Sequence, residues 1–211
     1  MGRTAGARNA DFEERRNALI QKARECLARQ SGEPPSFREL ALAAGVSVPT
    51  LRHYFGNREL LIKAVFAFYL DGGQRHLARA RAPEGTAVDL AAGLTQFLNR
   101  VVVGWTRGHV GSLHRIGLAE GLRSPATALS YLMDVLEPTL QALEQRLRAE
   151  IDRGAMMEAD TRHAALLLLS PVLLALLHQH DLGGTRCRPL AVPALIDEHV
   201  KVFIRAYRRD H

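Results

Sequence analysis

The sequence has few cysteines and no long apolar run. Cys26 and Cys187 are the only two cysteines in 211 residues, and they form no Cys-x-x-Cys pair. This excludes a disulfide scaffold and a zinc-finger framework. The first thirty residues contain no apolar core, so we expect no signal peptide. The longest strongly apolar stretch, residues 164–177, is interrupted by Ser170 and Pro171 and is too short to span a bilayer. We therefore expect a cytoplasmic chain with no membrane partner.

Motifs of the common enzyme classes are also missing. The sequence contains no Gly-rich phosphate loop, no Gly-x-Ser-x-Gly and no His-Glu-x-x-His. Among its nine histidines, His178 and His180 are two positions apart and would point to different sides of a helix, which is a poor arrangement for zinc. We therefore expect no metal, no cofactor and no enzymatic activity.

No segment alternates apolar and polar residues for long enough to predict a strand, so the sequence predicts an all-α fold. Clusters of glycine and proline divide the chain into helical segments. We expect a kink at Pro138, within the helical segment 124–154. The expected helical segments are 12–30, two short helices on either side of Gly45, 58–80, 88–106, a short helix around 113–118, 124–154, 160–180 and 191–208.

The excess of positive charge lies in the N-terminal part of the chain. The net charge is +6, and residues 1–82 carry 14 basic and 8 acidic side chains, which accounts for all of it. The excess ends at Pro83-Glu84-Gly85, a sequence typical of a joint between domains. We therefore expect a domain at 1–82 that binds a polyanion and a neutral domain at 83–211.

Residues 37–54 have the pattern of two short helices that cross at a steep angle. Ala41 is small enough for the helices to touch, and Gly45 tolerates the positive φ that a tight turn requires. Ser36 and Ser47 stand where N-caps are needed. The apolar residues expected to face the core are Leu40, Ala44, Val46, Leu51 and Tyr54. This pattern predicts a helix-turn-helix whose second helix enters the major groove of DNA.

Residues 45–61 resemble the signature of the TetR family of bacterial transcriptional regulators. The shared features are the Gly-Val-Ser turn at 45–47, the pair Thr50-Leu51, Phe55, and the basic-Glu-Leu sequence at 58–60. The resemblance implies an N-terminal three-helix helix-turn-helix domain, followed by a linking helix and a helical C-terminal domain for effector binding and dimerisation. It also implies a homodimer that binds a double-stranded DNA operator and responds to a small-molecule effector.

Several positions depart from the family pattern. Pro49 replaces glycine, Arg52 replaces tyrosine, Tyr54-Phe55 replaces His-Phe, and Arg58 replaces lysine. Arg52 could bond O6 and N7 of guanine or only a phosphate, and the sequence favours neither. A phosphate contact would survive the change to Arg58. The residues that we expect at the DNA are Ser36, Arg38, Ser47, Val48, Pro49, Thr50, Arg52, His53, Tyr54, Asn57 and Arg58.

The C-terminal part has apolar stripes that could either line a cavity or fill a core. Few charged residues lie on these stripes, which favours an apolar or aromatic effector. The candidate effector-binding residues are Leu94, Leu98, Val101, Trp105, His114, Tyr131, Met133, Leu136, Leu169 and Leu173. The candidate dimer contacts are Leu166, Leu174, Leu177, Ile196 and Phe203, because both of the last helices carry more apolar surface than one core needs.

The function that we expect is repression, with release from a palindromic operator when the effector binds. Alternatives are a transcriptional activator, or a regulator controlled by a protein partner that has no small-molecule ligand. A helical enzyme or lipid carrier would be a different class altogether, and DNA binding would exclude it.

Overall fold

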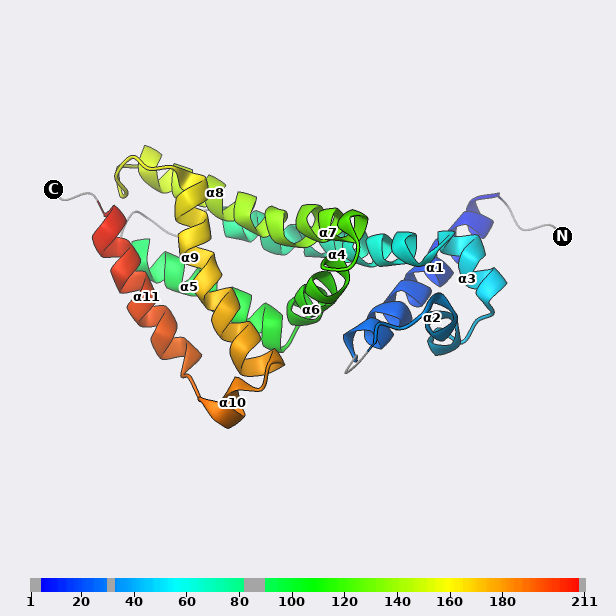
Figure 1. Cartoon of the computed structure of the whole chain (residues 1–211). Coiled ribbons are helices and arrows are strands. Elements are labelled where there is room, and N and C mark those ends of the chain that lie inside the picture. The colour runs from blue at the N-terminus through cyan, green and yellow to red at the C-terminus, as the bar shows by residue number, and fades with distance from the viewer. Residues whose placement is uncertain (1–4, 30–32, 82–89, 209–211) are drawn as a thin grey trace. The chain divides into compact units, whose positions relative to one another are not determined.

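The computed structural model describes residues 5–29, 33–81 and 90–208, and within them it contains helices and no named strand (Figure 1). The predicted all-α fold is thus confirmed, and the expected joint at 83–85 lies outside the described residues. The helices are α1 (Ala5–Ala28), α2 (Phe37–Ala43), α3 (Val48–Phe55), α4 (Arg58–Arg81), α5 (Leu90–Thr106), α6 (Val110–Gly121), α7 (Pro125–Tyr131), η1 (Leu132–Leu136), α8 (Glu137–Asp152), α9 (Thr161–Leu176), η2 (Leu177–Asp181), α10 (Gly184–Cys187) and α11 (Val192–Tyr207).

The expected helix at 124–154 consists of three consecutive elements. Ser124 caps α7 as predicted, accepting a hydrogen bond from the backbone of Thr127. The π-helical turn η1 then leads into α8, and Pro138 lies in the first turn of α8. The backbone is helical on both sides of Pro138, so its missing N–H and its ring are accommodated where the π-helical turn η1 meets α8. A second π-turn, η2, and the short α10 were not predicted.

The helices form two compact units. One contains residues 1–73 and 112–135, and the other contains residues 74–111 and 136–211. This division differs from the one expected at residue 82, because α6 and α7 pack with the N-terminal helices. Contacts between distant residues hold them there, including hydrogen bonds from Arg24 to Ser112 and from Ser124 to Glu59.

The core of the first unit is formed by one face of α1, the helix-turn-helix α2–α3, and α4. The buried residues of each helix lie on one face, next to one another or three or four positions apart, as expected for amphipathic helices. They include Leu19, Ile20, Ala23, Leu40, Ala41, Leu51, Phe55, Leu61, Ile62, Val65 and Phe66. This core fixes both helices of the helix-turn-helix against α1 and α4.

The second unit is built from α5, α8, α9 and α11 around one apolar cluster. At the start of α9, Arg162 holds α8, with both guanidinium nitrogens on Glu137 at 2.9 and 3.0 Å and one on Glu144 at 3.2 Å. The Arg162 contacts hold the pKa of Glu137 below its usual value.

The segment Thr161–Asp181, which comprises α9 and η2, is long and apolar enough to cross a membrane by length and composition alone. This segment is longer than residues 164–177, which were predicted to be too short for a bilayer. One face of α9, which includes Ala164, Leu168 and Val172, lies in the apolar cluster, as in the core helix of a globular unit.

Candidate nucleic-acid interface

The start of α2 is fixed by a capping box. Ser36 Oγ accepts a hydrogen bond from the backbone N–H of Glu39, and the Ser36 backbone N–H donates to the Glu39 carboxylate at 2.7 Å. The hydrogen bonds from the Ser36 hydroxyl and backbone hold the pKa of Glu39 below its ordinary value. The capping box satisfies the backbone N–H groups of Ser36 and Glu39, so α2 begins at a defined residue.

The turn between α2 and α3 has the geometry that the sequence predicts. Gly45 adopts φ +71°, in the left-handed region that favours glycine. Ala41 and Leu51 are buried where the two helices meet, and Ala44 is also buried, whereas Val46 and Tyr54 are only partly covered. The predicted helix-turn-helix is therefore present at the predicted residues.

The second helix, α3, presents a polar face to solvent at its N-terminal end. Ser47 caps it by accepting a hydrogen bond from the backbone of Thr50 at 3.2 Å, and Pro49 lies in its first turn. Leu51 and Phe55 hold the inner face in the core, which leaves Arg52 and His53 exposed. The exposed donors are thus mounted on a short helix that is held at both ends.

Helix α1 supports the C-terminal end of α3. The ring of Phe12 stacks on Tyr54 with centroids 4.7 Å apart, and the Arg16 guanidinium lies 5.4 Å from the centre of the Phe55 ring. These contacts are worth about 1 kcal/mol each. No local spacing in the sequence indicates these contacts, because they join residues about forty positions apart.

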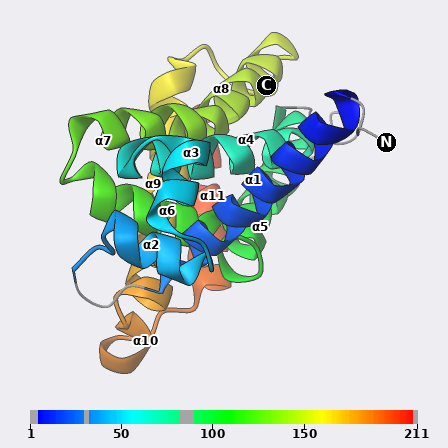
Figure 2. The same ribbon diagram turned by 90° about the vertical axis from the view of Figure 1, so that its right-hand side faces the viewer.

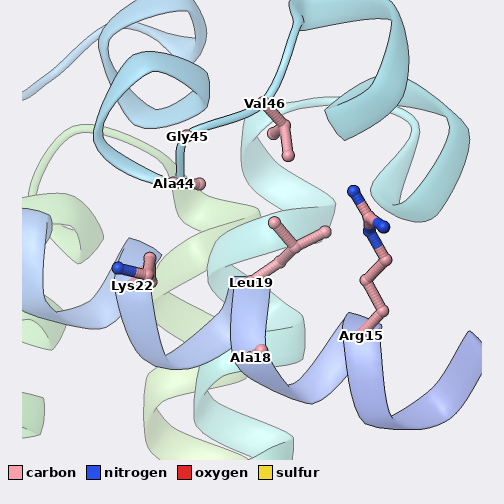
Figure 3. Close-up of a pocket in the computed structure, with 7 residues that line it drawn as sticks. All are labelled: Arg15, Ala18, Leu19, Lys22, Ala44, Gly45 and Val46. Atoms are coloured by element: carbon pink, nitrogen blue, oxygen red, sulfur yellow. The ribbon is translucent and has the colours of Figure 1, made fainter. Parts of the chain in front are cut away.

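A shallow pocket of about 190 Å³ lies between α1 and the turn (Figure 3). Leu19 and Val46 contribute apolar lining, and Arg15 extends from α1 toward the turn. Lys22, which lies further along α1, adds a second cation to the lining of the pocket. Figure 2 shows α1, α2 and α3 in a view turned by 90° from that of Figure 1. The positive charge predicted from the N-terminal sequence thus includes side chains next to the turn.

The predicted DNA-contacting residues fall into two groups. Those with exposed side chains are Ser36, Arg38, Ser47, Pro49, Arg52, His53 and Asn57. Val48, Thr50, Tyr54 and Arg58 are partly covered. Tyr54 faces Phe12, and the Oγ1 atom of Thr50 is 2.8 Å from Oγ of Ser47, so both also serve the local structure.

Arg58 differs most from its predicted role. Its Nη1 and Nη2 atoms donate to the two carboxylate oxygens of Glu120, each at 2.7 Å, and its Nε donates to the carbonyl oxygen of Pro35 at 2.8 Å. The side chain predicted to contact a phosphate therefore has protein partners on all three of its nitrogens. No local pattern in the sequence indicates Glu120 as the partner, because it is 62 residues away.

The candidate effector-binding residues do not form one set in the structure. Those that lie in the second unit, in or against its apolar cluster, are Leu94, Leu98, Val101, Trp105, Leu136, Leu169 and Leu173. The indole N–H of Trp105 donates to Asp181 at 3.0 Å. His114, Tyr131 and Met133 belong to the first unit, where His114 and Tyr131 are buried and Met133 is 56% exposed.

The candidate dimer contacts also divide. Leu166 and Leu174 are exposed on α9, by 37% and 66%, and Leu177 is half-buried. Ile196 and Phe203 are fully buried in the core of their own chain, so they have no surface left for a partner. The apolar spacing of α11 reflects the core of its own unit, whereas α9 is apolar on two faces.

No group of three or more His, Cys, Asp or Glu side chains that could hold a metal ion occurs within the described residues.

Two family models match this chain. Residues 19–65 match the model described as bacterial regulatory proteins of the tetR family, and residues 92–209 match the model of the AefR-like transcriptional repressor C-terminal domain. The comparison with curated protein sequences gives no match.

Solved structures share the fold over nearly the whole chain. GusR of Salmonella enterica is 23% identical with a TM-score of 0.68, and the alignment covers 91% of this chain and 96% of that one. The flavonoid-responsive regulator FrrA is 22% identical with a TM-score of 0.69, covering 94% and 100%. FadR of Bacillus subtilis, solved in complex with stearoyl-CoA, is 17% identical with a TM-score of 0.67, covering 89% and 97%. At these identities, the likeness concerns the fold.

Proposed function

Because this chain belongs to the TetR family of bacterial transcriptional regulators, we propose that it is a cytoplasmic homodimeric repressor. In this proposal residues 1–82 bind a palindromic DNA operator, and residues 83–211 carry the dimer contacts and bind a small apolar or aromatic effector that releases the DNA. The observation that carries the proposal is α3, a capped and supported helix whose exposed polar face fits a major groove.

The proposed contacts to DNA are of two kinds. Arg52 extends from α3 with five N–H donors and reads a base edge or holds a phosphate. Arg38, near the start of α2, and Arg15 and Lys22, beside the turn, provide charge for phosphates. Because such contacts release counterions, affinity falls steeply as salt rises.

The apolar outer face of α9 supports the dimer. Leu166, Leu167 and Leu174 are exposed in the single chain by 37%, 58% and 66%, on a helix whose other face is already in the core. Exposed leucines that lie together on one helix are typical of a subunit interface. A two-fold dimer presents two α3 helices, which fit half-sites whose centres are about 34–36 Å apart.

The proposed effector class rests on the apolar character of the candidate residues in the second unit and is supported by two proteins of the same fold. FrrA is named as flavonoid-responsive, and FadR was solved with stearoyl-CoA. Flavonoids are aromatic and stearoyl-CoA carries a long acyl chain. An effector that binds only the conformation with wrongly spaced α3 helices would shift the dimer away from DNA.

The test of the DNA-binding proposal is footprinting of the full chain on the DNA upstream of its own gene, at two salt concentrations. We expect a protected site with dyad symmetry and a steep loss of protection at the higher salt. Random duplex of the same length serves as the competitor. A protected site without dyad symmetry, or protection that is indifferent to salt, contradicts the proposal.

The effector proposal has a separate test. Stearoyl-CoA and a flavonoid such as quercetin are added to the protein, and the unfolding temperature and the footprint are followed. A ligand that binds the folded chain raises its unfolding temperature, and an effector also removes the protection. If the operator is bound but no apolar ligand changes either readout, control by a protein partner becomes the better account. A reporter gene distinguishes repression from activation.

A further inference from the structure

We propose that Arg58 and Glu120 act as a positioning pair, which holds the helix-turn-helix α2–α3 in the conformation that fits DNA. In this role Arg58 acts through Glu120 and is not a phosphate contact. The inference rests on the proposed DNA binding by α2–α3. It adds a role for α6, which holds α2–α3 through Glu120 without contacting DNA.

The pair has the geometry of a strong interaction. Two parallel N–H···O bonds of 2.7 Å join the guanidinium to both oxygens of Glu120. Glu120 is only 3% exposed, whereas the Arg58 side chain keeps 27% of its surface. A buried carboxylate needs an opposite charge, so Arg58 is the group that makes the burial of Glu120 possible.

Arg58 joins α6 to both ends of the helix-turn-helix. It is the first residue of α4 and follows directly on Gly56-Asn57, which end α3. Its Nε holds the carbonyl of Pro35, the residue before the cap of α2. One side chain therefore attaches the beginning of α2 and the end of α3 to the same carboxylate on α6.

A neighbouring contact reinforces the attachment. The Ser124 hydroxyl donates to the carboxylate of Glu59 at 2.8 Å, and the Ser124 backbone N–H donates to the carbonyl of Glu120. The end of α6 is thus joined to the first two residues of α4. Glu120 and Pro35 use three of the five guanidinium N–H groups of Arg58, and a phosphate that replaced Glu120 would leave a buried carboxylate without its counter-charge.

Two conservative variants separate positioning from phosphate binding. Glu120→Gln removes the charge that orients Arg58 but leaves Arg58 in place. Arg58→Lys keeps a cation for a phosphate but loses the bidentate pairing and the bond to Pro35. If the pair positions α2–α3, both variants weaken binding to the footprinted operator on the order of tenfold. The slope of log affinity against log salt stays at its wild-type value, because no phosphate contact is lost.

A phosphate role for Arg58 gives the opposite pattern and would overturn the proposal. Arg58→Lys would then bind nearly as the wild type, and Arg58→Ala would lower the salt slope by about 0.9. Glu120→Gln would leave affinity unchanged or increase it, because it frees a cation for the DNA. Glu25→Gln is the matched control, since it removes the same charge from an exposed carboxylate on α1, and we expect it to bind as the wild type.

A readout without DNA keeps the inference testable if no dyad operator is found. Hydrogen exchange of the full chain is compared between the wild type and Glu120→Gln. We expect the backbone amides of α3 and of the first turn of α4 to exchange roughly tenfold faster in the variant, while those of α8 and α9 exchange at unchanged rates. Unchanged exchange in α3 overturns the proposal, whether or not an operator has been identified.

Discussion

His114 lies inside the first unit with its Nδ1 atom 2.6 Å from the hydroxyl of Tyr131. Burial lowers the pKa of His114 to about 4 and raises the pKa of Tyr131 to about 12. The folded chain therefore keeps the imidazole neutral down to about pH 4, whereas the unfolded chain binds a proton below about pH 6.5. The free energy of unfolding must fall as the pH decreases through this window.

We expect the wild type to lose about 3 kcal/mol more stability between pH 7 and pH 4 than His114→Gln, which cannot titrate but can still bond Tyr131. Urea unfolding across this pH range measures the difference. Other titrating groups are the same in both chains and cancel in the comparison. Parallel curves of stability against pH would show that His114 does not titrate differently on unfolding.

Arg52 is the exposed residue of α3 best able to read a base. Arg52→Ala should weaken operator binding by roughly 1–3 kcal/mol and relax the preference at one base pair. Competition with operators mutated one pair at a time measures this. An equal loss on operator and random DNA would instead assign Arg52 to a phosphate. Unchanged affinity for both would remove Arg52 from the interface.

Two glycines show how the same substitution acts differently in a turn and in a helix. Gly45 adopts φ +71° in the turn, whereas Gly72 lies within α4, and an added Cβ would meet no atom within 4 Å at either position. Gly45→Ala should therefore lower the free energy of unfolding by about 1 kcal/mol through backbone strain alone. Gly72→Ala should raise it by about 0.5–1 kcal/mol because alanine favours helix. Urea unfolding of both variants tests the pair, and equal signs would contradict this account.

The sequence predicted the elements that depend on neighbouring residues. The caps at Ser36 and Ser47, the small Ala41 and the glycine turn follow rules that act within one or two helical turns, and the structure confirms them. The attachment of Arg58 to Glu120 depends on tertiary packing, so no local pattern indicates it.

The apolar periodicity of α9 and α11 predicted only part of how these helices pack. It identified amphipathic faces, but it did not show which face meets the chain's own core. Phe203 therefore appeared equivalent to Leu174, although the structure buries the first and exposes the second. A joint in the sequence likewise does not reveal with which helices α6 packs, so its packing with the N-terminal helices was not predicted.

The dimer can be tested with a matched pair of charges. Leu174→Glu places a carboxylate on the exposed face of α9 and should give folded monomers that fail to bind the operator. Phe203→Glu places the same group in the core and should instead reduce stability by several kcal/mol. Sedimentation reports the oligomeric state, and circular dichroism reports the folding of each variant. Wild-type protein that sediments as a monomer at micromolar concentration would refute the dimer.

If the exposed leucines of α9 form the proposed dimer, they also set how repression responds to the number of chains in the cell. If both copies of α3 are needed to hold the operator, only paired chains count. Below the dissociation constant of the pair, their number rises with the square of the total chain concentration. Halving expression in that range would leave about a quarter of the operator occupancy. Repression would therefore change from weak to strong over a narrow range of chain concentration. A variant that loosens α9 would move that threshold without altering a single contact to DNA.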